Sequence, residues 1–217
     1  MSLLDHLCGY SSSRLWCAIG GGGKTSLLES LAQEAARRGM PGTLTTTTRM
    51  YLPPSRWQEL TPGWRFWSCG LRDGKASGPT PLELQQQFGQ NPQHWMLVEA
   101  DGSRGLPLKV HAAHEPVLPP RPGLVLLLVG LSALETRVDE SVHRWQGYFE
   151  ADRLVDSQLV GEVVEGLARG AEGHPQVVVF NQAASPQQRE LALSWAQSHP
   201  GRPAIWRDFG WWGQVSL

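Results

Sequence analysis

The chain has 217 residues, with 19 Lys and Arg against 20 Asp and Glu and a formal net charge of -1. This length fits a single domain over residues 1–217 and excludes two independent catalytic units. A net charge so close to zero gives no general attraction to nucleic acid or to an anionic membrane, so neither is an expected partner.

Cysteine content and apolar runs predict the compartment. The three cysteines, Cys8, Cys17 and Cys69, form no Cys-x-x-Cys pair, and such a sparse, odd set suits a reducing environment. The longest apolar run, Leu124 to Val129, is far shorter than the roughly 20 residues of a membrane-spanning helix. We therefore expect a cytoplasmic protein that is neither secreted nor inserted in a membrane.

The first predicted elements are a strand, a glycine run and a helix. The apolar run from Leu15 to Ile19 predicts a buried strand, and residues 24–38 carry apolar side chains at helical spacing. Gly39 and Pro41 end that helix. The β-branched stretch from Gly42 to Thr48 predicts a second strand, which completes a βαβ unit with a right-handed crossover.

The remaining elements alternate between helix and strand. Residues 49–79, rich in Pro, Gly, Trp and Arg, are expected to be irregular apart from one strand at 64–69. Helices are predicted at 81–88, 152–169 and 185–198, and strands at 94–101, 124–129, 176–180 and 204–206. This alternation predicts an α/β fold with a doubly wound, mostly parallel sheet and helices on both faces, like that of P-loop NTPases.

The glycine run resembles a phosphate-binding loop. The stretch CAIGGGGKTS fits the pattern G-x-x-x-x-G-K-[ST] except that Ala18 stands at the first glycine. In such loops the glycine amides surround phosphates, the lysine reaches the β- and γ-phosphates, and the Ser or Thr hydroxyl binds Mg²⁺. The alternative is a flexible glycine turn before a helix. The candidate nucleotide-binding residues are Gly20, Gly21, Gly22, Gly23, Lys24, Thr25 and Ser26.

Glu99 and Asp101 follow an apolar strand at the edge where open α/β sheets bind ligands. One acid is expected to hold Mg²⁺ and the other to orient an attacking water or a substrate. In our mechanistic hypothesis, Thr25 and Asp101 bind Mg²⁺, and Glu99 orients the attacking nucleophile. The catalytic candidates are therefore Lys24, Glu99 and Asp101. The alternative is a pair of acids on a solvated strand end.

Two further sets of polar residues have open interpretations. Thr47 and Arg49, with the threonines around them, either contact phosphate or reflect only the strand preference of threonine. His111 and His114, three residues apart in a proline-rich loop, either bind a metal or form loop hydrogen bonds.

The sequence does not fix the base of the nucleotide. Asn181 stands where a GTPase carries N-K-x-D, but Gln182 and Ala184 replace the residues that would read guanine.

Several segments together resemble the YqeC family. These are IGGGGKTSLLESLA, LTTTTRM, LVEADGSRGLPLKVHAAHEPVLP, VGL and VHR, within residues 15 to 185, and EADGSRGLPLK followed by HEP is the most specific part. Members are described as accessory proteins of selenium-dependent hydroxylases and are similar in plan to P-loop NTPases. The resemblance implies nucleotide phosphate on Gly21 to Thr25, and an acidic and basic signature on Glu99, Asp101, Arg104 and Lys109. It implies no role for His114, Glu115, His143 or Arg144.

The expected function combines the motifs with this resemblance. We expect a Mg²⁺-dependent protein that binds and hydrolyses ATP or GTP and assists maturation of a selenium-dependent molybdenum hydroxylase, with that enzyme or a cofactor-maturation protein as partner. One alternative is a kinase or ligase whose acceptor lies on the loop 101–120. Another is a non-catalytic scaffold switched by nucleotide. The oligomeric state is open.

Overall fold

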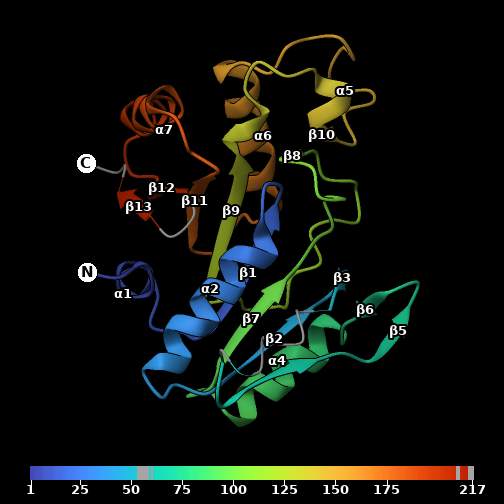
Figure 1. Ribbon diagram of the computed structural model, residues 1–217. Coiled ribbons are helices and arrows are strands. Elements are labelled where there is room, and N and C mark those ends of the chain that lie inside the picture. Colours follow the sequence, from blue (N-terminus) through green and yellow to red (C-terminus); the bar gives the residue numbers. More distant parts are fainter. Residues whose placement is uncertain (53–58, 60, 209–210, 215–217) are drawn as a thin grey trace. The chain divides into compact units, whose positions relative to one another are not determined.

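The computed structural model describes residues 1–52, 59, 61–208 and 211–214. It confirms an α/β fold with a large, mostly parallel central sheet (Figure 1). The structure divides into two compact units. The first consists of Met1–Ala18, Lys24–Gly102 and Val117–Val125, and the second of Ile19–Gly23, Ser103–Pro116 and Leu126–Leu217. A single domain over 1–217 stays a prediction.

The strands of the first unit lie in the order β1 (Leu15–Gly20), β7 (Trp95–Glu99), β2 (Gly42–Thr46) and β4 (Trp64–Trp67), all parallel. Strand β1, which ends in the second unit, has every residue buried, as its apolar run predicts. The pairing sets Thr46 beside Glu99, so the carboxyl ends of β2 and β7 meet at one edge.

Strand β2 ends at Thr46 and not at Thr48 as predicted. The Thr46 side-chain oxygen accepts a hydrogen bond from the Thr48 backbone N–H at 3.0 Å, which turns the chain out of the strand. Threonine commonly forms such local turns, which compete with the pairing of strands.

Helix α2 (Lys24–Arg37) packs on β7 and β2 through a buried apolar face, close to the predicted 24–38 (Figure 1). Helix α4 (Pro81–Gln90) begins after Thr80, whose side chain accepts the Glu83 N–H in a capping box. Both helices were predicted. Helix α1 (Leu3–Cys8) was not, because six residues are too few to show a helical repeat.

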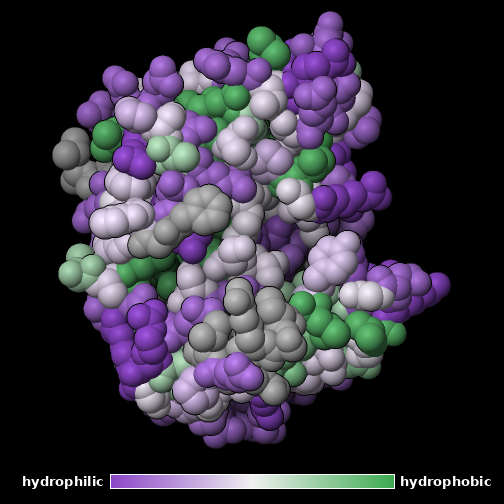
Figure 2. Space-filling model, in the orientation of Figure 1, coloured by the Kyte–Doolittle hydropathy of each residue, from purple (hydrophilic) through white to green (hydrophobic). Residues whose placement is uncertain are grey.

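Part of the stretch 49–79 is regular, contrary to prediction. Strands β3 (Arg49–Tyr51), β6 (Lys75–Ser77) and β5 (Gly70–Arg72) form a small antiparallel sheet in that order. Residues 53–58 and 60 of this stretch lie outside the described residues. Figure 2 shows hydrophobic atoms at the surface over the β5–β6 hairpin, where Leu71 is exposed. Strands of three residues are too short for a reliable alternation of apolar and polar side chains.

The strands of the second unit lie in the order β9 (Leu124–Gly130), β11 (Gln176–Asn181), β12 (Ala204–Asp208) and β13 (Trp211–Gln214), and β9 begins in the first unit. Strand β9 is buried throughout, as expected for an apolar run inside a parallel sheet. Strands β11 and β12 are parallel, whereas β13, which was not predicted, pairs antiparallel with β12.

The second unit also holds the helices α5 (Val138–Ser141), α6 (Ser157–Gly170) and α7 (Pro186–Ser198) and the short 3₁₀ helix η1 (Leu131–Ala133). Helix α6 begins later than the predicted residue 152 because Asp156 caps it, accepting the Leu159 N–H at 2.7 Å. No helix in the described part of the chain is long and apolar enough to cross a membrane.

Candidate functional site

The glycine loop, residues Gly20–Gly23, lies in the second unit. Three of its four glycines have positive φ, between 78° and 102°, a region that L side chains rarely adopt. A Cβ on Gly22 would lie 2.4 Å from the Gly130 Cα, and one on Gly21 would lie 2.6 Å from the Pro107 carbonyl oxygen. At Gly20, Gly21 and Gly22 the loop therefore passes too close to neighbouring backbone for any side chain.

The loop is held by hydrogen bonds within the second unit. The Gly21 N–H donates to the Leu128 carbonyl at 3.0 Å, and the Gly22 N–H donates to the Leu106 carbonyl at 3.1 Å. The Asn181 Nδ2 donates to the Gly22 carbonyl at 2.6 Å. Asn181, whose position suggested base recognition, thus fastens the glycine loop. The base of the nucleotide stays open.

In the first unit, the start of α2 contacts the end of β7. The Lys24 Nζ lies 3.1 Å from the Asp101 Oδ1, and these side chains are 3% and 0% exposed. The Thr25 hydroxyl donates to the Glu99 carboxylate at 2.6 Å. The structure thus brings together the four residues of the mechanistic hypothesis, although Thr25 meets Glu99 and not Asp101. Ser26 is exposed.

Carboxylates lie at the end of β7 and on α2 near the start of that helix. Burial, and after it the charge of Glu99, raises the pKa of Glu29, which lies on α2. Asp101 lies beside Lys24, and Glu99 accepts the Thr25 hydroxyl, so two carboxylates and a hydroxyl come together at the start of α2. Carboxylate oxygens are ligands that Mg²⁺ commonly takes in proteins.

Among the described residues, no group of three or more His, Cys, Asp or Glu side chains could hold a metal ion. His111 and His114 therefore belong to no such group, and the His111 ring packs beside Gly170 at the end of α6. Mg²⁺ is commonly held by one or two protein oxygens together with substrate phosphates, so the first-unit residues remain suitable.

The threonines after β2 have structural hydrogen bonds. The Thr46 hydroxyl donates to the Glu99 carbonyl at 2.7 Å, and the Thr47 hydroxyl donates to the Val117 carbonyl at 2.6 Å. Both bonds fix the backbone at and beyond the end of β7. Arg49 is exposed on β3. Contacts of Thr47 and Arg49 with phosphate stay predictions.

Arg104 and Lys109 belong to a different group in the second unit. Strands β8 (Leu108–Lys109) and β10 (Val142–His143) pair in parallel and set Lys109 beside His143. The Lys109 Nζ lies 2.9 Å from the Glu115 carboxylate, and their side chains are 0% and 5% exposed. Arg144 donates to the same Glu115 oxygen. We call these residues the basic cluster: Arg104, Lys109, Glu115, His143 and Arg144.

Ionisation in the basic cluster is shaped by burial and by its cations. Burial opposes ionisation of Glu115, but the hydrogen bond and charge of Lys109 outweigh it and hold the pKa of Glu115 below its ordinary value. Burial, followed by the charges of Arg144, Lys109 and Arg104, lowers the pKa of His143 to about 4. At neutral pH the cluster therefore holds an ionised Glu115 and a neutral His143.

Sequence reasoning left Glu115, His143 and Arg144 without a role. They come from two segments, HEP and VHR, that carry the family resemblance but lie far apart in the chain. The signal was the density of charged residues in both segments, of which the one around HEP is rich in proline and the one around VHR has none. Only the pairing of β8 with β10 shows that these segments meet.

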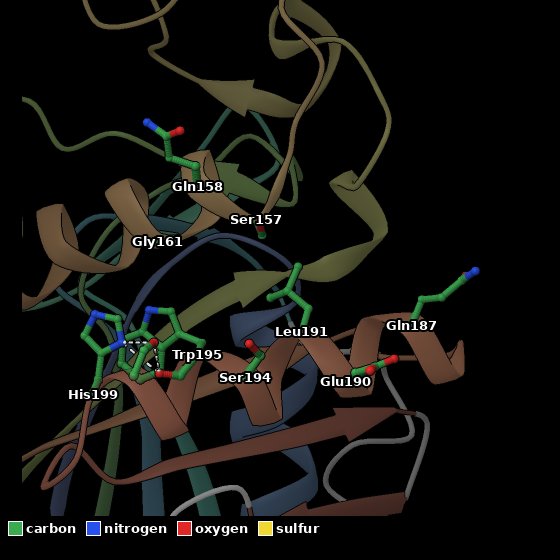
Figure 3. Close-up of a pocket in the computed structure, with 10 residues that line it drawn as sticks. Ser157, Gln158, Gly161, Gln187, Glu190, Leu191, Ser194, Trp195 and His199 are labelled. Atoms are coloured by element: carbon green, nitrogen blue, oxygen red, sulfur yellow. Dashed lines mark hydrogen bonds between the residues drawn. The ribbon is translucent and has the colours of Figure 1, made fainter.

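A cavity of about 540 Å³ lies between α6 and α7 in the second unit. Figure 3 shows Gly161 of α6 on one side and Trp195 and His199 on the other. The rings of Trp195 and His199 are stacked, with centroids 4.2 Å apart. None of the site residues predicted from the sequence lines this cavity.

Comparisons with known proteins agree with the resemblance. The family model described as YqeC protein matches residues 16–146. The chain is 36% identical over 175 residues to the Escherichia coli (strain K12) protein named "Uncharacterized protein YqeC", covering 73% of this chain and 67% of that protein. No solved structure matches. The family match covers the glycine loop, Glu99, Asp101 and the basic cluster. Because both this family model and the relative match, the chain belongs to the YqeC family.

Proposed function

We propose that the protein binds a nucleoside triphosphate with Mg²⁺ at the start of α2 and hydrolyses it, as a P-loop NTPase-like protein. The observation that carries this proposal is the buried pair of Lys24 and Asp101 next to the hydrogen bond between Thr25 and Glu99. A buried lysine and two carboxylates at the end of a parallel strand suit phosphate and metal recognition.

Phosphate binding would begin with the start of α2. The first backbone N–H groups of a helix have no partner within the helix, and the helix dipole favours an anion there. Lys24 would exchange Asp101 for phosphate oxygens, which leaves the Asp101 carboxylate available to a cation. Gly21 and Gly22 could contribute their amides only by giving up their bonds to Leu128 and Leu106.

Thr25 and Asp101 would hold Mg²⁺, which when bound neutralises charge on the phosphates. The Thr25 hydroxyl donates its proton to Glu99, so its oxygen lone pairs are left for a cation. Glu99, which accepts the Thr25 hydroxyl, would accept a proton from an attacking water.

The test is calorimetric titration of MgATP and MgGTP into the parent protein and Lys24→Ala. We expect saturable binding by the parent, weakened at least about tenfold in the variant because the lysine charge is lost. Lys75→Ala, which removes a half-buried lysine of the same unit that lies over the Tyr51 ring, is the control and is expected to bind as the parent does. Equal binding by Lys24→Ala would contradict the proposal.

A phosphate-release assay then tests hydrolysis. We expect release by the parent and at least about a hundredfold slower release by Glu99→Gln, with nucleotide still bound. Tight binding with no release above the buffer blank would favour a nucleotide-switched scaffold.

We also propose that this activity assists maturation of a selenium-dependent molybdenum hydroxylase, as the family resemblance implies. The test is hydroxylase activity in cells that lack the gene. Activity should return with the parent gene and not with Lys24→Ala. Full recovery with the variant would separate nucleotide binding from maturation.

Phosphoryl transfer is a second candidate function, because the basic cluster offers positive charge for an anionic acceptor on the loop 101–120. Product analysis distinguishes the two. Free phosphate formed without any acceptor supports hydrolysis, and a product that requires an acceptor supports transfer.

A further inference from the structure

We propose that the basic cluster is a second ligand site, which binds a small-molecule oxyanion group carrying two negative charges, as in a phosphate monoester. The residues that contact it are Arg104, His143 and Arg144, and the buried Lys109–Glu115 pair forms the base. The proposal does not rest on nucleotide binding, because all five residues lie in the second unit and away from Lys24 in the chain.

The first support is the balance of charge. The groups acting most strongly on His143, after burial, are the cations Arg144, Lys109 and Arg104 and the carboxylate Glu115. Three of these four groups are cations, which suits an anionic ligand. A phosphate group carries more negative charge than a single carboxylate. Phosphate esters are dianions near neutral pH.

The second support is the placement of the cations. Lys109 and Glu115 are almost fully buried, whereas the Arg144 side chain is 36% exposed and Arg104 is exposed. Arg144 and Lys109 share one oxygen of Glu115, so a single carboxylate anchors two cations. The two arginines can therefore meet a ligand from solvent, with guanidinium groups that suit phosphate oxygens.

The third support is the backbone of both arginines. Arg104 and Arg144 have φ values of 53° and 63°, although neither is a glycine. Such conformations are sparsely populated and gather at binding sites, where the surrounding structure enforces them. Here the Val110 N–H, which donates to the His143 carbonyl at 2.9 Å, fixes the backbone next to Arg144.

The site is connected to the glycine loop within the second unit. Leu106 and Pro107, which lie between Arg104 and Lys109, accept the N–H groups of Gly22 and Gly130. A conformational change in the glycine loop would thus move the segment that carries Arg104 and Lys109. This connection suits an anionic acceptor or cargo molecule.

The experiment is an NMR titration with inorganic phosphate and, separately, with phenyl phosphate, followed at the His143 imidazole. It is performed on the parent, Lys24→Ala, Arg104→Gln and Arg144→Gln. The matched control is Arg202→Gln, since Arg202 also pairs with a glutamate, Glu165, on the surface of the same unit. Circular dichroism verifies that each variant is folded.

We expect saturable binding by the parent, Lys24→Ala and Arg202→Gln, and about tenfold weaker binding by Arg104→Gln and Arg144→Gln. Tighter binding of phenyl phosphate would indicate a phosphate ester as the ligand, and tighter binding of inorganic phosphate would indicate a free oxyanion. Unchanged affinity in both arginine variants, or no saturable binding, would overturn the proposal. Loss of phosphate binding in Lys24→Ala alone would also overturn it, because it would locate the phosphate at α2. Loss of MgATP binding in Lys24→Ala bears only on the proposed nucleotide function.

Discussion

Two buried lysine–carboxylate pairs lie in different units and have different neighbours. Lys24 and Asp101 are 3.1 Å apart, and Lys109 and Glu115 are 2.9 Å apart. The first pair lies next to the Glu99 carboxylate, which Thr25 contacts, whereas Arg144 shares the Glu115 carboxylate of the second pair. We propose a cation site at the first pair and an anion site at the second, with the neighbouring groups deciding which ion would bind.

The largest expected effect comes from removing one carboxylate charge from each pair. Glu115→Gln leaves the cations of the basic cluster unbalanced and should lower the free energy of unfolding by about 3–5 kcal/mol. Asp101→Asn should cost only about 1–2 kcal/mol, because it also relieves repulsion among the remaining acids. Urea unfolding at neutral pH measures both. Equal losses would break the comparison.

The next effect tests the glycine loop in the unit that holds the basic cluster. Gly22→Ala requires a Cβ at φ 78° and 2.4 Å from the Gly130 Cα, and should cost roughly 3 kcal/mol. The control is Gly39→Ala, at φ 70° with no atom within 4 Å of the added Cβ, which should cost about 1 kcal/mol. Similar losses in denaturant unfolding would show that the close packing of the loop contributes little.

The free energy of unfolding should depend on pH through His143 of the basic cluster. Its pKa falls from 6.5 to about 4 on folding, so the unfolded chain binds more protons between these values. Stability should be fully present above pH 6.5 and should decrease by about 1–2 kcal/mol as the pH falls towards 4. In His143→Asn this decrease should be smaller. An identical pH profile in the variant would contradict the lowered pKa of His143, which burial and, after it, the nearby cations cause.

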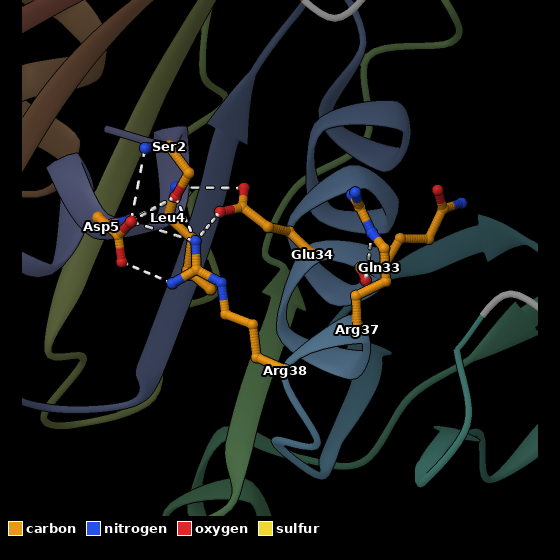
Figure 4. Close-up of polar contacts among 7 residues, drawn as sticks. All are labelled: Ser2, Leu4, Asp5, Gln33, Glu34, Arg37 and Arg38. Carbon is orange, nitrogen blue, oxygen red and sulfur yellow. Dashed lines mark hydrogen bonds and ion pairs between the residues drawn. The ribbon is translucent and has the colours of Figure 1, made fainter.

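The smallest effect is expected from a surface pair that lacks burial. Arg38 donates to Asp5, Ser2 and Glu34 beside α1, as Figure 4 shows. The side-chain hydrogen bond from Arg38 lowers the pKa of Asp5 to about 2. This stabilisation is present above pH 3.8 and is lost as the pH falls through about 2.

Arg38→Ala should therefore change stability little at pH 7, because exposed ion pairs are screened by water. NMR titration should show the pKa of Asp5 rising towards 3.8. A loss of stability as large as that of Glu115→Gln would show that pairing, and not burial, governs the comparison.

Much of the first-unit site could be predicted from the sequence because its signals are local. Lys24 and Thr25 follow a glycine run at the start of a helix, and Glu99 and Asp101 follow an apolar strand. The carboxyl ends of parallel strands meet at one edge, which brings these segments together. The partners within that site could not be predicted, since the contact of Thr25 with Glu99 depends on how α2 packs on the sheet.

The sequence alone determined the α/β class, the strand–glycine–helix unit and the YqeC family, because periodicity and motif spacing are properties of neighbouring residues. Only the tertiary structure decided that Asn181 fastens the glycine loop and that Glu115 is shared by Lys109 and Arg144. These contacts join segments far apart in the chain, and their geometry depends on backbone pairing that no local pattern encodes. The sequence gives the charge of each residue, whereas the net charge around each proposed site depends on which residues folding brings together.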